Sequence, residues 1–346
     1  MEDTTRGRYE YRQVESILEE RRVNARRALD VRRRRAFGLI PELEDIEYNI
    51  SEAGLKYNRS LLSGSQSLSE VNAVLEGEID ALKSRRAELL DNSGLSADYM
   101  SLTPYCPHCG DTGYAPGAAG TPEQCACFKL ILFAILEAAS NIANAGPAGF
   151  GLFDETLYSG DADSIKYGQA VSPRDNIIKI RDSALRFVNS INGGANENLY
   201  FFGPPGTGKT FTAASIAIEL MRSGSSALYI SAPDLFNTIT EHRLRAFRDD
   251  AYSDILFRRA FSCRLLVIDD LGIEPATEAR YSEFIALLNG RLASGFYSTI
   301  ISTNMDLKKL RERYDERILS RIIGSFSIIR FYGDDIRLRR PGIKII

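Results

Sequence analysis

The stretch FFGPPGTGKT, residues 201–210, joins two aromatic residues to a glycine-rich loop that ends in lysine and threonine. Its last eight residues fit the pattern G-x-x-x-x-G-K-[ST], which cradles nucleotide phosphates. The apolar run 198–202 predicts a strand directly before the loop, and the segment 210–224 predicts a helix directly after it. Because the motif needs this order of strand, loop and helix, the stretch indicates a P-loop domain of the α/β class.

The loop supplies the groups that hold a triphosphate. Its glycines let backbone N–H groups curl around the phosphates, and the amino end of the following helix adds partial positive charge. Lys209 brings a positive charge to the terminal phosphates, and the Thr210 hydroxyl is a magnesium ligand. We therefore expect ATP and Mg²⁺ as cofactors. The predicted nucleotide-binding residues of the loop are Gly203, Pro204, Pro205, Gly206, Thr207, Gly208, Lys209, Thr210 and Phe211.

A second apolar run, RLLVIDDLG at 264–272, ends in two acidic residues. Strand geometry puts Asp269 at the carboxyl edge of a sheet, where its carboxylate can hold magnesium through water. Asp270 is then placed to polarise the attacking water. Since aspartate is one methylene shorter than glutamate, we expect slow hydrolysis, with the nucleotide acting as a switch. The alternative is that the two acids only cap the next turn.

From about residue 172 onward, short apolar runs alternate with helical segments, which indicates a parallel sheet. One run ends in the polar pair Thr303 and Asn304. In a parallel sheet this edge faces the γ-phosphate, so Asn304 could orient the attacking water. The predicted strands are 198–202, 227–230, 265–269, 299–303 and 327–331.

Five motifs occur in the order and spacing of the AAA+ ATPases: GPPGTGKT, LLVIDDLG, STN, YDERILSRIIG (314–324) and GDDIR (333–337). Within that class the chain most resembles bacterial replicative helicase loaders of the DnaC/DnaI type, which are related to transposition helper ATPases. The motifs cover about half of the chain. The resemblance implies a five-stranded parallel sheet in the order 5-1-4-3-2, preceded by a helical arm and a small zinc-binding module.

The resemblance also implies roles for two arginines beyond the loop. Arg321 would be an arginine finger that reaches the γ-phosphate held by a neighbouring subunit, with Arg317 as the less favoured choice. Arg337 would be a second sensor that contacts the phosphates, in the same subunit or in a neighbour. The alternative for each arginine is a surface or helix-end ion pair. The predicted catalytic set is therefore Asp270, Asn304 and Arg321.

Four of the five cysteines cluster with the spacing C-x2-C-x15-C-x-C, which suits tetrahedral zinc. Because all four ligand positions are filled by thiolates, such a site would be closed and structural. The alternatives are free or redox-active thiols, with His108 as a less suitable substitute ligand. The resemblance extends here, since DnaI-type amino-terminal domains carry a similar cysteine site used in helicase contact. The predicted zinc ligands are Cys106, Cys109, Cys125 and Cys127.

The amino-terminal hundred residues predict three helices, over 8–35, from about Pro41, and from the capping box that begins at Ser67. Residues 1–35 hold eleven arginines against seven acids, whereas 36–100 hold twelve acids against five bases. This asymmetry favours an arm built for contacts with a partner protein. The alternative is an ordinary helical hairpin.

The stretch 241–264 interleaves seven basic residues with four aromatic ones, a composition that suits single-stranded nucleic acid. In the loader resemblance this stretch faces the central channel of an assembly. The predicted DNA contacts are Arg243, Arg245 and Arg248. The alternative is an amphipathic helix that packs its aromatic residues inside.

Together these features predict an ATPase that loads a replicative DnaB-type helicase onto single-stranded DNA and self-associates head to tail. The alternatives are a transposition helper ATPase of the IstB type and a nucleotide-switched adaptor that does not hydrolyse. Apolar runs too short for a bilayer, no export signal and clustered cysteines favour the cytoplasm and no membrane contact. The predicted domains are a helical arm (1–100), a zinc module (101–130), a helical linker (131–171) and the ATPase domain (172–346).

Overall fold

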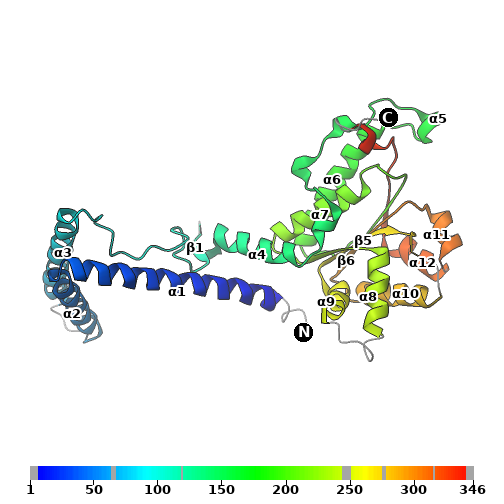
Figure 1. Cartoon of the computed structure of the whole chain (residues 1–346). Coiled ribbons are helices and arrows are strands. Elements are labelled where there is room, and N and C mark those ends of the chain that lie inside the picture. Colours follow the sequence, from blue (N-terminus) through cyan, green and yellow to red (C-terminus); the bar gives the residue numbers. More distant parts are fainter. Residues whose placement is uncertain are drawn as a thin grey trace. The chain divides into compact units, whose positions relative to one another are not determined.

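The structure is a computed structural model that describes residues 7–63, 68–117, 120–243, 251–274, 278–314 and 316–339. The chain divides into two compact units, Met1–Phe128 and Lys129–Ile346 (Figure 1). The division falls inside helix α4 (Ala126–Ala138). The finer predicted division into four domains stays a prediction.

Three long helices dominate the amino-terminal unit, as the sequence predicts: α1 (Gly7–Leu39), α2 (Glu42–Ser63) and α3 (Leu68–Asn92). Ala36 of α1, Leu43 of α2 and Leu90 of α3 are fully buried in one small core. The predicted cap Ser67 lies outside the described residues. A short antiparallel pair follows, β1 (Tyr114–Pro116) and β2 (Pro122–Gln124), which closes the loop between the two cysteine pairs.

The carboxy-terminal unit is built on a five-stranded parallel sheet in the order β4-β5-β6-β3-β7. Numbered along the chain and read from β7, this is the predicted order 5-1-4-3-2. Each observed strand matches a predicted one with ends that differ by two residues at most. The strands are β3 (Leu199–Phe202), β4 (Ala227–Ser231), β5 (Leu265–Leu271), β6 (Ser298–Thr303) and β7 (Ser327–Arg330).

Helices cover both faces of this sheet, which is why its central strands read as continuous apolar runs. Helix α7 packs on one face, with α6 against it, while α8, α9 and α10 lie on the other (Figure 1). No single described helix is long and apolar enough to cross a membrane, and α4 with Ile142–Leu152 passes that test only as a pair bent by 70°. The helices are α5 (Ser164–Tyr167), α6 (Pro173–Asn192), α7 (Lys209–Arg222), α8 (Ala232–Arg243), α9 (Ala251–Ser262), α10 (Glu278–Ala293), α11 (Leu307–Arg313) and α12 (Glu316–Ser325). The 3₁₀ turns are η2 (Ile142–Ala145), η3 (Phe150–Leu152), η4 (Glu155–Leu157) and η6 (Ile336–Arg339).

The strand register decides which residues meet at the carboxyl edge of the sheet. Phe202, the last residue before the phosphate loop, pairs with Thr303 on one side and Arg330 on the other. On β5, Asp269 pairs with Ser231. The phosphate loop, the acidic pair and Asn304 therefore leave the sheet at the same level.

A buried arginine fastens the opposite edge of the sheet. Arg291 of α10 is 1% exposed and donates hydrogen bonds to the backbone oxygens of Ala260 (2.8 Å), Cys263 (3.2 Å) and Ser298 (2.6 Å). Its Nε also donates to the Thr299 hydroxyl at 2.9 Å. One guanidinium thus joins α9, α10 and β6.

We expect Arg291→Ala to lower the free energy of unfolding by about 3 kcal/mol, because it removes the buried hydrogen bonds that the guanidinium donates to three backbone oxygens. Urea denaturation followed by circular dichroism measures the change. The matched control is Arg222→Ala, which removes an exposed arginine paired with Glu219 at 2.7 Å and should change stability by about 0.5 kcal/mol or less. Equal effects of the two substitutions would contradict the anchoring role.

Candidate nucleotide-binding site and metal centre

The phosphate loop is hemmed in by segments far away in the sequence. Gly203 has φ +149°, and a side chain there would collide with the backbone oxygen of Phe331. On the other side, the buried Tyr158 hydroxyl donates to the backbone oxygen of Thr207 at 3.3 Å. The segment predicted as a linker, 131–171, thus contributes a wall to the loop, and the chain from 129 onward forms one compact unit.

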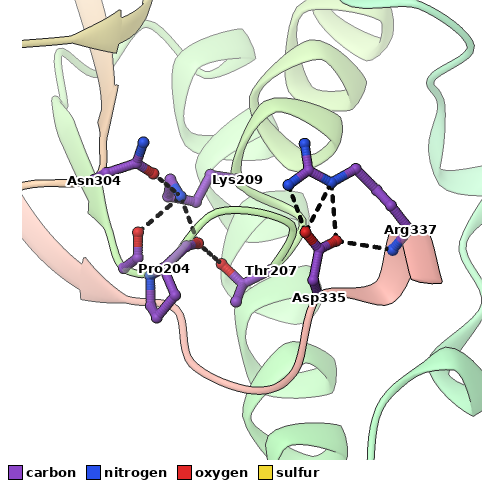
Figure 2. A network of polar contacts seen from close by, with 7 residues as sticks. Pro204, Thr207, Lys209, Asn304, Asp335 and Arg337 are labelled. Atoms are coloured by element: carbon purple, nitrogen blue, oxygen red, sulfur yellow. Dashed lines mark hydrogen bonds and ion pairs between the residues drawn. The ribbon is translucent and has the colours of Figure 1, made fainter. Parts of the chain in front are cut away.

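Lys209 is the centre of the site (Figure 2). Its ammonium group donates hydrogen bonds to the backbone oxygens of Gly203 and Pro204 and to Oδ1 of Asn304, each at 2.8 Å. The side chain is buried, and burial lowers the pKa of Lys209 to about 8, although Asp270 and Asp269 oppose the shift. A buried cation held only by neutral oxygens is stabilised by an anion, so the loop fits a phosphate.

Asp269 lies at the carboxyl edge of the sheet, beside the phosphate loop. Its Oδ2 accepts hydrogen bonds from the Thr210 hydroxyl at 2.8 Å and from the Tyr229 hydroxyl at 2.6 Å. Its Oδ1 is buried and has no hydrogen-bond partner among the described residues. A buried carboxylate oxygen without a partner is costly unless a cation or a bound water satisfies it. Thr210 and Asp269 therefore fit a hydrated Mg²⁺ beside the phosphates.

Asp270 has an unusual backbone. Its φ is +53°, in the left-handed region, and the pairing of β5 with β6 shifts register between Ile268 and Leu271. Such a conformation costs about 1 kcal/mol for a non-glycine residue and tends to occur at functional sites. Asp270 is the one exposed residue of β5, whose other residues are buried. Loss of hydration and the Asp269 carboxylate raise the pKa of Asp270, while Lys209 acts in the opposite direction.

The other predicted catalytic and sensor residues divide into two groups. Asn304 and Arg337 lie beside the loop, Asn304 through Lys209 and Arg337 through Asp335, whose carboxylate holds the guanidinium (Figure 2). Arg321 is exposed on α12, and its Nε donates to Oδ1 of Asn289 on α10 at 2.7 Å. One chain thus brings together the phosphate loop, Asp269, Asp270 and Asn304. Arg321 does not join this group and is hydrogen-bonded to Asn289 instead.

The structure tests little of the predicted DNA-contacting stretch. Arg245 and Arg248 lie outside the described residues, as does the side chain of Arg243, the last residue of α8. In the neighbouring helix, Phe257 stacks on His242 at 3.8 Å and packs against the buried core together with Phe261. These two aromatic rings favour the packing alternative for their own positions.

Three residues of this site carry no role in the sequence prediction. Tyr229 lies in a predicted strand, and only the strand register brings its hydroxyl to Asp269. Tyr158 lies in the predicted linker, where nothing local marks it. Asp335 belongs to the GDDIR motif and stands two residues before the predicted sensor Arg337, and this closeness in sequence is the one indication of its role.

The four clustered cysteines converge in the amino-terminal unit. Their sulfur atoms all lie within 4.8 Å of one another, with Cys106 and Cys125 at 3.8 Å and Cys109 and Cys127 at 3.4 Å. Tetrahedral zinc with Zn–S bonds of about 2.3 Å separates its sulfurs by about 3.8 Å. Hydrogen bonding to the Cys109 backbone amide lowers the pKa of Cys106 to about 7, whereas burial raises the pKa of Cys127. The geometry therefore fits a metal with four thiolate ligands.

A buried carboxylate shapes the loop around this cluster. Asp111 is fully buried at φ +60°, and its oxygens accept hydrogen bonds from the backbone N–H groups of Tyr105 and Cys106, both at 2.8 Å. Arg22 of α1 donates to the backbone oxygen of Asp111 at 3.0 Å. The first cysteine pair is thus held by its own loop and by α1.

Comparison with known proteins gives the chain's relatives. Residues 161–341 match the sequence family described as IstB-like ATP binding protein. Over 162 residues the chain is 30% identical to the replicative helicase loader DnaC of Escherichia coli K12, a match that covers 46% of this chain and 63% of that protein. Over 164 residues it is also 30% identical to an insertion-sequence ATP-binding protein of Sinorhizobium fredii, covering 45% and 64%. The chain thus spans less than two thirds of these relatives' length.

Solved structures that are similar to the chain include two crystal structures. The crystal structure of DnaI matches with a TM-score of 0.43 and 25% identity, covering 56% of this chain and 93% of that one. The crystal structure of the DnaC helicase loader matches with a TM-score of 0.39 and 20% identity, covering 52% and 100%.

We expect the affinity for Mg·ATP to fall as the pH rises above about 8. Below this pKa Lys209 is protonated and ready for the phosphates, whereas above it each binding event must first take up a proton. At high pH the affinity should approach a tenfold loss for each pH unit. Isothermal titration calorimetry from pH 7 to 9.5 measures this, in a window above the titration of the terminal phosphate at about 6. Lys179→Ala, an exposed lysine of α6, should keep the dependence, and a flat profile would contradict it.

We expect one zinc ion per chain in freshly purified protein, measured by plasma mass spectrometry. Cys127→Ala should release most of it, because three thiolates hold zinc less tightly than four. Cys263→Ala is the matched control, since Cys263 is buried in the other unit and should leave the zinc content unchanged. Less than about half an equivalent in the wild type would count against the metal centre.

Proposed function

The chain belongs to the family of IstB-like ATP-binding proteins, and from this premise we propose that it is an ATPase that loads a replicative DnaB-type helicase onto single-stranded DNA. The observation that carries the proposal is the convergence of Lys209, Asp269 and Asn304 at the carboxyl edge of one parallel sheet. The sequence identity of 30% to a replicative helicase loader supports a helicase as the partner.

Hydrolysis follows from the chemistry of these groups. Bound Mg²⁺ would neutralise the charge that develops on the phosphates, held in place by Thr210 and Asp269. Asp270 accepts a proton from the attacking water, and its raised pKa brings its basicity closer to that task. Asn304 orients that water while Lys209 exchanges its backbone acceptors for phosphate oxygens.

A neighbouring subunit completes the site. Arg321 is exposed on α12 and is oriented there by Asn289, so its guanidinium can serve a nucleotide held by another copy of the chain. An arginine supplied in trans stabilises the transition state of phosphoryl transfer. Head-to-tail self-association follows, with Arg243, Arg245 and Arg248 as the proposed contacts to single-stranded DNA.

The amino-terminal unit takes the part of a docking arm for the helicase. Its helices carry segregated charge, and its four cysteines can hold a structural zinc beside α1. We expect this charge to attract a partner protein of complementary charge, in a contact that weakens as the salt concentration rises. We place the reaction in the cytoplasm, whose reducing environment keeps the thiols available to metal.

A transposition helper ATPase is the second candidate, because one insertion-sequence ATP-binding protein is as similar to the chain as the loader is, at 30% identity. The two functions share the nucleotide site and differ in partner. A helper would act with a transposase, whereas a loader would act with a helicase on single-stranded DNA.

We expect the full-length chain to bring the host's replicative helicase onto a single-stranded DNA circle in the presence of Mg·ATP. Helicase that remains on the circle after gel filtration measures loading, and released phosphate measures turnover. Lys209→Ala should abolish both, because the triphosphate loses its central cation. Lys179→Ala serves as the control that keeps both activities.

Two results would contradict this proposal. Equal phosphate release from the wild type and Lys209→Ala would reject the ATPase. ATP turnover that responds to double-stranded DNA and a transposase, with no helicase retained, would favour the helper.

A further inference from the structure

The turn that follows β7 is fastened to the phosphate loop itself. The backbone N–H of Ile336 donates to the oxygen of Gly206 at 3.0 Å, and that of Phe331 donates to Phe202 at 2.7 Å. Residues 331–337 therefore run along the loop from its first residue to its centre. Side chains of this turn can therefore reach the phosphate loop.

One side chain of this turn brings a negative charge to the phosphate loop. The carboxylate of Asp335 lies against Gly206, so closely that a side chain on this residue would collide with it. Two features therefore favour glycine at position 206: the left-handed backbone, with φ +69°, and the contact with Asp335. A fixed negative charge in contact with the phosphate loop is unfavourable for a polyanionic ligand unless a cation neutralises it.

Arg337 is the cation that neutralises it (Figure 2). Its Nε donates to both oxygens of Asp335, at 2.8 and 3.1 Å, and its Nη2 donates to Oδ2. The backbone N–H of Arg337 adds a third donor at 3.0 Å. The Nε–Nη2 edge of the guanidinium is thus committed to Asp335.

The balance of charge in the site makes this commitment important. Lys209 and Arg337 face Asp269, Asp270 and Asp335, which leaves one net negative charge before any nucleotide binds. Mg·ATP brings further negative charge. It can gain the full contribution of Arg337 only if the guanidinium leaves Asp335, at least on one edge.

We infer that Asp335 is an internal competitor that withholds Arg337 from the nucleotide and thereby weakens Mg·ATP binding. This inference rests on the ATP site of the proposed function and adds a residue that controls affinity. The pair can exchange partners readily, because Arg337 is 64% and Asp335 27% exposed, and exposed pairs contribute little to stability. Only a ligand with enough charge near Arg337 takes it over, which favours a nucleotide whose phosphates reach it.

The chain offers a matched control in the preceding residue. Asp334 carries the same charge on the same turn, but its carboxylate pairs with Lys166 at 2.6 Å and with the Tyr167 hydroxyl at 3.3 Å. Asp334→Asn therefore removes one negative charge near the site without releasing Arg337.

Calorimetric titration of the full-length chain with Mg·ATP tests the inference. Asp335→Asn should bind Mg·ATP about fivefold tighter than the wild type, and Asp334→Asn should stay within about twofold. Asp335→Glu, which keeps the charge, should stay near the wild type. Asp335→Ser should reproduce the gain of Asp335→Asn, so that the result does not depend on one replacement.

A double-mutant cycle with Arg337→Ala separates release of the arginine from simple removal of charge. In that background Asp335→Asn should gain about twofold at most, because no guanidinium remains to be released. Unchanged or weaker binding by Asp335→Asn, or a full gain in the Arg337→Ala background, would overturn the inference. The complete pattern in a chain that loads no helicase would support the inference and reject the loader function.

Discussion

One ammonium group ties together the two segments on which the site depends. Lys209 reaches back to two backbone oxygens of its own loop and across to Asn304 at the end of the next strand. None of these partners carries a charge, and burial lowers the pKa of Lys209 to about 8, against the opposing effect of Asp270 and Asp269. The loop is therefore preorganised around a buried cation. Phosphate binding stabilises this cation without having to assemble the site.

The parallel register is what allows a single lysine to do this. β3, β5 and β6 end at the same level, so the loop, Asp269 and Asn304 emerge side by side. The same register brings the Tyr229 hydroxyl to Asp269, where it shares the carboxylate with Thr210. The remaining oxygen of Asp269 is left for a cation. Two sides of the site are thus poised for ligands of opposite charge.

The cysteine loop of the amino-terminal unit is stabilised with only a small apolar core. Its cysteine loop packs Gly113 against Leu18 of α1 and Phe128 of α4, leaving no room for a larger residue. The buried carboxylate of Asp111 supplies the hydrogen bonds that such a small core cannot provide through regular strands. A metal among the four sulfurs would add a further cross-link, which is how small modules commonly reach stability.

The sequence by itself predicted the P-loop fold and its five strands and singled out Lys209, Thr210 and Asp269, because these depend on local periodicity and on motifs of fixed spacing. The order of the strands followed only from the family resemblance. The sequence also determined the cysteine cluster, whose ligands lie in two short pairs. Only the tertiary structure decided that Asp335 holds Arg337, that Tyr158 and Tyr229 border the site, and that Arg321 bonds with Asn289. These contacts join residues whose neighbourhood is set by strand register and by the return of the chain after β7. A long-range contact has no period along the chain, so it becomes visible only when the sheet has brought its two ends together.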